Sequence, residues 1–438
     1  MSHSDQIQFR VEAGGALCGD VRVPGDKSIS HRSIMLGSLA NGVTQVSGFL
    51  EGEDSIATLE AFRAMGVKIE RLNQGELRIH GVGLHGLQAP SQALDLGNSG
   101  TSMRLLSGLL SGQPFDTELT GDVSLSGRPM RRVTEPLAQM GAQIETTEKG
   151  TAPLKIRGGH KLKGIEYLSP VASAQVKSCL LLAGLYAQGE TCVTEPAVTR
   201  DHTERMLRGF GYTVRRNGST VCLQGGGELT AAQLDIPADI SSAAFFMVGA
   251  SIAPGSDLLL RHVGMNPTRI GVINILRAMG ANIEIQSPRE VNGEPVADIR
   301  ITSADLHGIA IPEDQVPLAI DEFPALFVAA ACAEGETVLT GAKELRVKES
   351  DRIQAMADGL VALGVDARPT EDGMIINGGP IGSGEVNSHG DHRIAMSFAM
   401  AALRAEGEIV IRDCANVNTS FPDFAHLATQ TGLKLAVS

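Results

Sequence analysis

The sequence predicts a mixed α/β fold made of six copies of one unit, in the order helix, strand, helix, strand, strand. Two glycines recur in every copy. The first follows an apolar helical segment, at Gly42, Gly112, Gly189, Gly255, Gly335 and Gly407. The second ends an amphipathic segment, at Gly66, Gly141, Gly211, Gly280, Gly364 and Gly432. In addition, a polar cluster precedes every apolar segment. Steps of 66 to 84 residues between equivalent glycines exclude a short-period solenoid.

The apolar segment of each copy predicts a buried helix, because a helix that is apolar on nearly every side has no face suited to water. These helices are expected at residues 30–41, 101–111, 174–188, 241–253, 323–334 and 393–405. The second helix of each copy is amphipathic, as in residues 55–65, and is expected to cover the outside. The strands alternate polar and apolar residues, as in residues 297–301.

The strands at the two ends of the chain predict a circular arrangement. Five copies finish with a strand such as residues 154–159, whereas the sixth does not, and a matching segment occurs at residues 7–11. We therefore expect this segment to complete the sixth copy. Three copies then form each of two domains, residues 21–237 and residues 1–20 plus 238–438. Two domains joined by two crossings predict a hinge and a ligand cleft.

Composition limits the class of protein. A length of 438 residues suits two or three domains rather than one core. The chain is 42% apolar and 20% charged, which is typical of a globular protein. Its net charge of −13 argues against a general binder of nucleic acid or anionic membranes, but it allows a local basic pocket for an anionic ligand.

The cysteines and the first residues predict a cytoplasmic protein. Six cysteines occur without any C-x-x-C pair, so we expect buried free thiols in a reducing compartment, with disulfides or a metal as the alternative. Residues 1–5 lack the features of a signal peptide. The longest apolar runs, such as residues 243–253, are far shorter than the roughly 20 residues that span a membrane.

Lys27 to Arg32 open the first buried helix with two bases and several small polar residues. Ser28 or Ser30 can cap this helix. Free amides and the helix dipole attract an anion at such a start, and Lys27 and Arg32 add full positive charges. The alternative is a capped helix with two surface bases. The Gly-x-x-x-x-Gly-Lys pattern of a P-loop is absent.

A second polar cluster enters the second buried helix at residues 96–104. Gly97 and Gly100 in this cluster allow the backbone to approach a ligand closely. Three arginines follow in the same copy, at Arg128, Arg131 and Arg132. Arginines grouped in this way suit forked recognition of a phosphate or carboxylate. An ordinary strand-to-helix turn and a solvated basic face remain the alternatives.

Carboxylates lie beside bases in the second half of the chain. Asp321 and Glu322 precede a buried helix, so Asp321 is either an N-cap or a reactive carboxylate. Residues 343–352 are dense in both signs. Glu349 in this segment is therefore either part of an exposed, ion-paired helix start or a group that donates and accepts protons.

The remaining polar cluster precedes the last buried helix. His389 and His392 could bind a metal, but their spacing offers no third ligand, and Arg393 is the better contact for an anion. Together, the bases and carboxylates fit two small molecules that carry phosphate or carboxylate groups, with proton transfer between them. The sequence has no nucleophile elbow, dinucleotide fingerprint or metal motif, so we expect neither a metal nor a cofactor.

Four motifs together resemble the 5-enolpyruvylshikimate-3-phosphate synthase family of enolpyruvyl transferases. They are PGDKSISHR at 24–32, LGNSGT at 96–101, RVKESDR at 346–352 and GDHR at 390–393. The resemblance covers nearly the whole chain. It implies a two-domain inside-out α/β barrel of six βαβαββ units, three per domain, which agrees with the six copies and their circular closure.

The resemblance implies transfer of the enolpyruvyl group of phosphoenolpyruvate to the 5-hydroxyl of shikimate-3-phosphate, with release of phosphate, on the route to chorismate and the aromatic amino acids. The first domain would hold most of the shikimate-3-phosphate. The residues implied for shikimate-3-phosphate are Lys27, Ser28, Arg32, Ser173, Gln175, Arg200, Asp321 and Lys348. Those implied for phosphoenolpyruvate are Lys27, Gly100, Arg128, Gln175, Arg352 and Arg393.

The implied catalytic residues are Asp321, Glu349 and Lys27. Asp321 would act on the 5-hydroxyl proton, Glu349 would exchange the methylene proton, and Lys348 would contact the substrate or the reacting oxygens. Protonation of the enol carbon makes a cationic centre, the hydroxyl attacks it, and elimination expels phosphate. Closure of the domains would exclude water. The implied protein is a cytoplasmic monomer that needs no cofactor and binds neither nucleic acid nor a membrane.

Two positions depart from the pattern of some relatives. Ala174 stands between Ser173 and Gln175 where those relatives have a second serine, and Thr419 stands where they have a lysine. We therefore assign no late-chain lysine to the site. Both changes resemble a more divergent bacterial branch of the family. Gly100 implies room for the inhibitor glyphosate, which an alanine would crowd.

Two other functions remain open. The sister family that transfers enolpyruvate to UDP-N-acetylglucosamine usually has a cysteine on a loop after its second buried helix, and residues 113–140 contain none. A ring-shaped DNA clamp of six related units would spread its bases along helices that line a hole. Here the bases cluster at helix starts beside carboxylates, which favours the enzyme.

Overall fold

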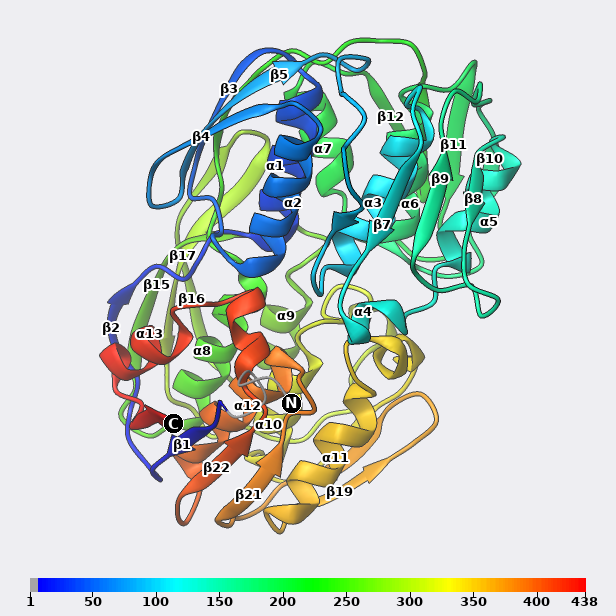
Figure 1. Cartoon of the computed structure of the whole chain (residues 1–438). Helices are drawn as coiled ribbons and strands as arrows, with labels where there is room; N and C mark the ends of the chain where they lie inside the picture. Colours follow the sequence, from blue (N-terminus) through cyan, green and yellow to red (C-terminus); the bar gives the residue numbers. More distant parts are fainter. Residues whose placement is uncertain (1–6) are drawn as a thin grey trace. The chain divides into compact units, whose positions relative to one another are not determined.

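The computed structural model describes residues 7–438, which fall into two compact units. The N-terminal unit is Gly25–Ile236. The C-terminal unit combines Pro237–Ser438 with residues 7–24. In Figure 1 the dark-blue strand β1 lies beside the red strand β22, so the start of the chain is part of the C-terminal unit.

The N-terminal unit contains three copies of one order of elements. The first copy is α1 (Lys27–Leu39), β3 (Asn41–Ser47), α2 (Glu53–Ala64), β4 (Lys68–Asn73), β5 (Glu76–Val82) and β6 (Leu94–Asp95). The second is α3 (Gly100–Ser111), β7 (Thr117–Thr120), α4 (Val123–Ser126), α5 (Arg131–Gln139), β8 (Gln143–Glu145), β9 (Leu154–Arg157) and β10 (Glu166–Leu168). The third is α6 (Ala174–Gly184), β11 (Glu190–Thr194), α7 (His202–Gly209), β12 (Val214–Asn217), β13 (Thr220–Gln224) and β14 (Gln233–Asp235).

The C-terminal unit repeats the same order. Its first copy is α8 (Ile240–Ile252), β15 (Asp257–Gly264), α9 (Gly271–Ala278), β16 (Asn282–Val291), β17 (Glu294–Thr302) and the short 3₁₀ helix η2 (Glu313–Gln315). The second is α10 (Phe323–Ala331), β18 (Glu336–Leu339), η3 (Lys343–Val347), α11 (Arg352–Ala362), β19 (Asp366–Pro369), β20 (Met374–Asn377) and β21 (Gly384–Asn387). The third is α12 (His392–Ala401), η4 (Ala402–Arg404), β22 (Ile409–Arg412), η5 (Ala415–Thr419), α13 (Phe424–Thr431) and β23 (Leu435–Val437), with β1 (Phe9–Val11) and β2 (Cys18–Val21) from the start of the chain.

The sheets share one strand order, in which the last strand of one copy pairs in parallel with the first strand of the next. The N-terminal unit has the sheets β6-β7-β9-β8, β10-β11-β13-β12 and β14-β3-β5-β4. Because β14 pairs with β3, its third copy closes on its first. The C-terminal unit has β2-β15-β17-β16, β18-β20-β19 and β21-β22-β1-β23. Two parallel bridges, His307 with Glu334 and Ala310 with Val338, take the place of a fourth strand beside β18.

The predicted completion of the sixth copy by residues 7–11 is confirmed. Strand β1 lies between β22 and β23, with Phe9 opposite both Ile411 and Val437. Strand β2 pairs in parallel with β15 and closes the C-terminal unit in the same way that β14 closes the other. The first residues of the chain therefore supply two strands to the C-terminal unit.

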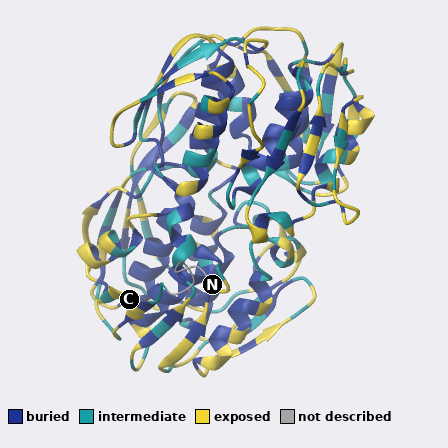
Figure 2. Ribbon diagram, viewed as in Figure 1, coloured by how far each residue is buried: buried dark blue, intermediate teal, exposed yellow. Residues whose placement is uncertain are grey.

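The first helix of each copy forms the core of its unit, as the sequence predicts. Every residue of α8 and of α10 is buried, and Figure 2 shows the dark blue of buried residues concentrated on such helices inside each unit. A helix without a polar face is stable in water only when other parts of the protein cover it on every side. Among the described residues, no helix has the length and apolar character needed to cross a membrane.

The expected start of the first helix is wrong. Helix α1 begins at Lys27, three residues earlier than predicted, because Asp26 rather than one of the predicted serines caps it. The Asp26 carboxylate accepts a hydrogen bond from the Ile29 amide at 2.8 Å. The Ser30 hydroxyl instead accepts from the Leu50 amide at 3.0 Å and ties the helix to the following loop.

The expectation that all cysteines are free thiols is also wrong. Cys192 on β11 and Cys222 on β13 form a disulfide, while the other four cysteines are free. The two are direct cross-strand partners with Cα atoms 4.1 Å apart. The register of the two strands places these cysteines side by side. Because they are 30 residues apart in the sequence, no local pattern could predict the disulfide.

Candidate functional site

The starts of helices α1, α3 and α6 meet in the N-terminal unit. His31 Nδ1 on α1 lies 2.8 Å from Thr58 Oγ1 and 3.3 Å from Ser102 Oγ on α3. Arg32 on α1 reaches across to α6, where its Nη2 donates to Ser178 Oγ at 2.8 Å. The structure therefore brings together the polar clusters that the sequence places at three separate helix starts.

Lys27 and Ser28 occupy the first turn of α1, and both are partly exposed. The Lys27 ammonium forms an ion pair with the buried carboxylate of Asp54 on α2. Because this partner holds the ammonium at the helix start, the backbone amides and the positive charge can act on the same anion.

Arg32 is nearly buried, and each of its nitrogens has a fixed partner. Its Nε donates to Thr203 Oγ1 at 2.7 Å and its Nη1 to the Ser28 carbonyl at 2.9 Å, in addition to the bond to Ser178. Neutral oxygens accept all three of these hydrogen bonds, and together they orient the guanidinium.

Gly100 and Arg128 lie against each other at the start of α3. A methyl group added at Gly100 would lie 3.0 Å from Arg128 Nη1. Arg128 Nη2 donates to Asn98 Oδ1 at 2.5 Å and to Ser124 Oγ at 3.3 Å. The missing side chain at Gly100 thus leaves the space in which the guanidinium sits beside the helix start.

Gln175 is positioned by groups from α3. Its side-chain amide donates to Thr101 Oγ1 at 3.0 Å, and its oxygen accepts a hydrogen bond from Arg104. Arg104 also donates to the Pro129 carbonyl at 3.3 Å. Ser173 caps α6 and accepts from the amide of the third residue that follows it, at 3.4 Å.

Arg200 lies apart from these helix starts in sequence, within residues 195–201, which connect β11 to α7 without regular structure. Its side chain is half-buried. Thr203, which follows on α7, accepts the bond from Arg32, so this connection meets the same group of side chains.

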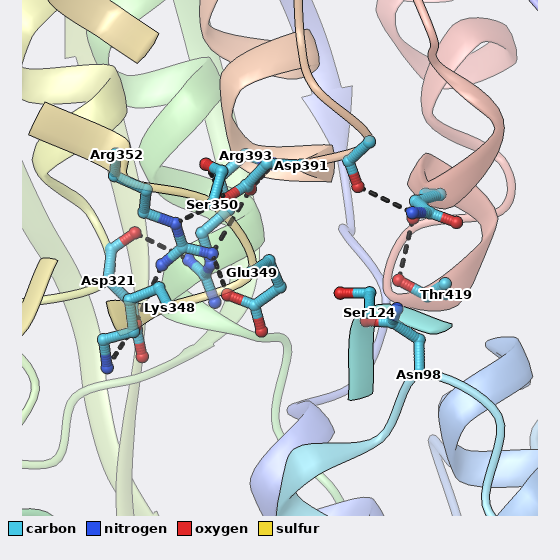
Figure 3. Close-up of polar contacts among 12 residues, drawn as sticks. Asn98, Ser124, Asp321, Lys348, Glu349, Ser350, Arg352, Asp391, Arg393 and Thr419 are labelled. Carbon is cyan, nitrogen blue, oxygen red and sulfur yellow. Dashed lines mark hydrogen bonds and ion pairs between the residues drawn. The ribbon is translucent and has the colours of Figure 1, made fainter. Parts of the chain in front are cut away.

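In the C-terminal unit, Arg352 at the start of α11 is the centre of a cluster of carboxylates, shown in Figure 3. Its Nη2 donates to Glu349 at 2.6 Å, its Nε to Asp391 at 2.8 Å, and its Nη1 to Asp321 at 3.2 Å. Ser350 Oγ also donates to Asp391, at 3.1 Å. Three segments that are far apart in the sequence therefore meet at one guanidinium.

Charge pairing outweighs burial in this cluster. Burial of Arg352 lowers the pKa of its guanidinium, but the carboxylates of Asp391, Glu349 and Asp321 overcome this effect and raise it. Burial likewise raises the pKa of Asp391, yet Arg352 overcomes this effect and the pKa is lowered. Arg352 and Asp391 thus form a buried charged pair, and Asp391 also caps α12 by accepting from the Arg393 amide at 3.0 Å.

Asp321, Lys348 and Glu349 line the accessible side of this cluster. Their side chains are 13%, 21% and 23% exposed, whereas Arg352 beneath them is 1% exposed. Lys348 Nζ lies 3.3 Å from Asp321 Oδ1. A ligand can therefore reach one ammonium and two carboxylates that could exchange protons with it.

Arg393 and Glu322 form a neighbouring contact at the start of α10. Arg393 Nη1 donates to the Asp321 carbonyl at 2.9 Å and lies 3.7 Å from Glu322 Oε1. Glu322 is fully buried, accepts a hydrogen bond from Ser241 on α8, and lies 3.8 Å from Arg269. Of the two adjacent carboxylates, Asp321 therefore lies on the accessible side and Glu322 supports the helix starts from within.

The described residues contain one group of three possible metal ligands, Glu190, Cys192 and Cys222, and its two cysteines are joined in the disulfide. His389 and His392 belong to no such group. His389 has a φ of 53° and forms the turn before α12. Thr419 is buried, and its hydroxyl donates to the Asn416 carbonyl at 2.7 Å.

Several residues that hold the site were not predicted from the sequence. Asp54, Arg104, Ser178, Thr203 and Asp391 each contact a predicted site residue. In the sequence, most of these residues look like any other charged or hydroxyl-bearing residue of a helix, because no motif surrounds them. Asp391 is the exception, because an aspartate directly before a buried helix signals a cap.

Comparisons with known proteins agree with this geometry. Residues 11–427 match the family described as EPSP synthase (3-phosphoshikimate 1-carboxyvinyltransferase). A 3-phosphoshikimate 1-carboxyvinyltransferase of Methylococcus capsulatus is 72% identical over 436 residues and covers 100% of both chains. A solved EPSP synthase of Acinetobacter baumannii is 62% identical, with a TM-score of 0.89 over 99% of this chain and 100% of that one.

The enolpyruvyl transferase NikO of Streptomyces tendae shares the fold. It is 16% identical, with a TM-score of 0.78 and 99% coverage of both chains. The predicted inside-out α/β fold is confirmed.

Proposed function

This chain belongs to the EPSP synthase (3-phosphoshikimate 1-carboxyvinyltransferase) family, and on that basis we propose which residues bind each substrate and which transfer protons. The enzyme transfers the enolpyruvyl group of phosphoenolpyruvate to the 5-hydroxyl of shikimate-3-phosphate and releases phosphate, in aromatic biosynthesis. The observation that carries the proposal is the pair of polar clusters, one in each unit, that present bases at helix starts. In the C-terminal unit these bases lie beside accessible carboxylates.

Shikimate-3-phosphate is proposed to bind mainly to the N-terminal unit. The start of α1 offers Lys27, Ser28 and the positive end of the helix dipole to its phosphate, and Arg32 lies beside them, with its Nη1 bonded to the Ser28 carbonyl. The other proposed contacts are Ser173, Gln175 and Arg200 in the N-terminal unit, with Asp321 and Lys348 of the C-terminal unit. A dianionic phosphate suits this setting, because it can replace several separate hydrogen-bond partners at once.

Phosphoenolpyruvate is proposed to be held by four cations and two neutral positions. The cations are Lys27, Arg128, Arg352 and Arg393, and the neutral positions are Gly100 and Gln175. Arg352 is held by Asp321 and Glu349 in this structure, so the incoming anion competes with these carboxylates for the guanidinium. This competition frees both carboxylates for proton transfer when the substrate binds.

Proton transfer is proposed to use the two accessible carboxylates. Glu349 delivers a proton to the methylene carbon of phosphoenolpyruvate and later removes one from the resulting methyl group. Asp321 accepts the proton of the 5-hydroxyl as its oxygen forms a bond to the cationic carbon. Breakage of the carbon–oxygen bond to phosphate then completes the elimination, and the phosphate leaves with the proton that Asp321 took from the hydroxyl. Lys27 and Lys348 stabilise negative charge that develops on the reacting oxygens.

We also propose the setting in which the enzyme works. The two units are proposed to act as the two domains of one monomer in the cytoplasm, with both clusters serving one reaction. A net charge of −13 supports small anionic substrates in a local basic site over nucleic acid or an anionic membrane surface as partners. The proposed chemistry requires no cofactor.

Phosphate release from phosphoenolpyruvate by the purified chain tests this function. The assay compares shikimate-3-phosphate with UDP-N-acetylglucosamine as acceptor, both in the presence of a chelator. Release with shikimate-3-phosphate alone is the expected result. Release with the other acceptor would assign the chain to the sister reaction, and activity that the chelator abolishes would contradict a reaction without a metal.

A further inference from the structure

A buried group of three charges lies in the N-terminal unit beside the proposed phosphate site. Lys177 on α6 is 0% exposed, and its Nζ lies 2.8 Å from Glu195 Oε2 and 2.9 Å from Glu204 Oε1. Each of the two carboxylates is 1% exposed. Burial of charges is costly, and even a paired group is often no more stabilising than apolar side chains of the same size, so stability alone does not explain this arrangement.

The three charges hold both ends of one connection. Glu195 directly follows β11, and Glu204 lies in the first turn of α7, so one ammonium on α6 binds the start and the end of residues 195–204. Thr199 in the middle is bound as well. Its carbonyl accepts from Lys177 Nζ at 3.4 Å, and its hydroxyl donates to Glu195.

The same connection carries two groups of the proposed phosphate site. Arg200 follows directly after Thr199. Thr203 accepts the Arg32 Nε bond at 2.7 Å and donates to Ser178 Oγ at 2.7 Å. Ser178 is the residue after Lys177, and α7 packs against α1 in Figure 1. A shift of this connection would therefore move Arg200 and release Arg32 together.

We propose that Lys177, Glu195 and Glu204 are positioning residues that fix residues 195–204, and with them Arg200 and Arg32, in the geometry that binds the phosphate of shikimate-3-phosphate. This inference rests on the proposed function of the N-terminal unit. The connection has no strand or helix of its own between residues 195 and 201, so these ion pairs supply the order that regular hydrogen bonding gives elsewhere.

The test removes the charges while it keeps the volume of the side chains. Lys177→Met leaves two buried carboxylates without their cation and could prevent folding. The triple variant Lys177→Met, Glu195→Gln, Glu204→Gln has no buried charge and is expected to fold. In the triple variant the dissociation constant of shikimate-3-phosphate, measured by titration calorimetry, should rise on the order of tenfold to a hundredfold. The KM of phosphoenolpyruvate and kcat at saturating shikimate-3-phosphate should stay within about threefold.

An exposed group that also pairs one cation with two carboxylates provides the control. Arg157 on β9 pairs with Asp116, directly before β7, at 2.9 Å and with Glu145 on β8 at 2.7 Å. The variant Arg157→Met, Asp116→Asn, Glu145→Gln should bind shikimate-3-phosphate as the wild type does. If it weakens binding equally, the loss in the buried variant is a general effect of lost ion pairs, and the positioning role is wrong.

Two further outcomes would overturn the proposal, and they can be told apart. If the wild type binds shikimate-3-phosphate and the buried triple variant binds it equally well, the positioning role fails while the proposed function stands. If the wild type itself does not bind shikimate-3-phosphate, both fail. A fall in kcat and a rise in the KM of phosphoenolpyruvate that match the loss of shikimate-3-phosphate binding would indicate general loosening and also contradict the proposal.

Discussion

Individual arginines of the two clusters are held in different ways. Neutral oxygens of Ser28, Ser178 and Thr203 hold Arg32, whereas three carboxylates hold Arg352. An anion that binds Arg352 must therefore compete with Asp321 and Glu349 for its guanidinium. The second arrangement couples anion binding to the release of carboxylates, which acid–base catalysis requires.

Asp321→Asn should lower kcat by about 10² or more while it changes the KM of either substrate much less. The amide keeps the size of the side chain but cannot accept the hydroxyl proton. Steady-state kinetics with each substrate varied in turn measures the effect. Asp314→Asn, on the exposed 3₁₀ helix η2, is the matched control and should behave as the wild type. Retained turnover in the Asp321 variant would rule out its role in proton transfer.

Gly100→Ala should raise the KM of phosphoenolpyruvate by about tenfold, because the new methyl group would lie 3.0 Å from Arg128 Nη1 and push the guanidinium away. The KM of shikimate-3-phosphate serves as the internal reference and should change little. An unchanged KM of phosphoenolpyruvate would show that Arg128 does not need its present position to bind it.

His31 makes stability depend on pH. Burial, and then the charges of Lys27 and Arg32, hold the pKa of His31 well below its usual value. The unfolded chain therefore takes up a proton near pH 6.5 that the folded chain does not. Well above that pH, this histidine costs the folded chain nothing. Below it, proton uptake by the unfolded chain lowers the free energy of unfolding by up to about 1.4 kcal/mol per pH unit.

Replacement of His31 by Asn should remove this part of the pH dependence. Urea unfolding at several pH values between 5 and 8, with wild type and His31→Asn compared, measures the difference in slope. Parallel curves for the two proteins would contradict a neutral, buried histidine at this position.

Helices that carry the site pack closely enough to leave no room for a side chain. At Gly108 on α3, an added methyl group would lie 2.0 Å from the backbone carbonyl of Cys179 on α6. These two helices present Gly100 and Gln175 at their starts. Their close approach therefore sets the distance between the groups proposed to bind phosphoenolpyruvate.

Gly108→Ala should destabilise the protein by about 1–3 kcal/mol, since a backbone atom cannot move aside as a flexible side chain can. Gly209→Ala is the control, because Gly209 lies at the end of α7 with open space around it. That variant should be as stable as the wild type or slightly more stable. Equal melting temperatures for the Gly108 variant and the wild type would refute the close contact.

At the scale of the whole molecule, each unit is closed in the same way. The last copy of the unit supplies a strand to the sheet of its first copy. Strand β14 returns to β3 in the N-terminal unit, and β2 joins β15 in the C-terminal unit. Five of the six sheets of the described residues include a strand from another copy, and bridges from another copy extend the sixth, so the copies depend on one another. Each unit should therefore unfold as one cooperative body.

Removal of residues 1–11 should loosen the C-terminal unit and leave the N-terminal unit unchanged. The deletion exposes the facing edges of β22 and β23 and removes the buried side chains of Phe9 and Val11, at a cost of roughly 3–6 kcal/mol. Hydrogen exchange should speed up in β22 and β23 but not in Gly25–Ile236. Unchanged protection of β22 would contradict the role of β1.

The sequence alone predicts the repeated elements and the helix starts where function is concentrated. Apolar periodicity and recurring glycines depend on local physics, and so the buried helices, the strand alternation and the completion of the last sheet by residues 7–11 could be predicted. The resemblance on four motifs added the reaction, which the family shows. The residues proposed for each substrate stay a prediction.

Only the tertiary structure decided which side chains touch. Asp391 and Arg352, Lys177 and Glu195, and Cys192 and Cys222 are paired through packing and strand register. The sequence pointed to Ser28 or Ser30 as the cap of α1, but Asp26 caps this helix in the folded chain. A charge pattern along a chain is the same for a solvated surface and a buried ion pair, because burial depends on contacts between segments that the local sequence does not contain.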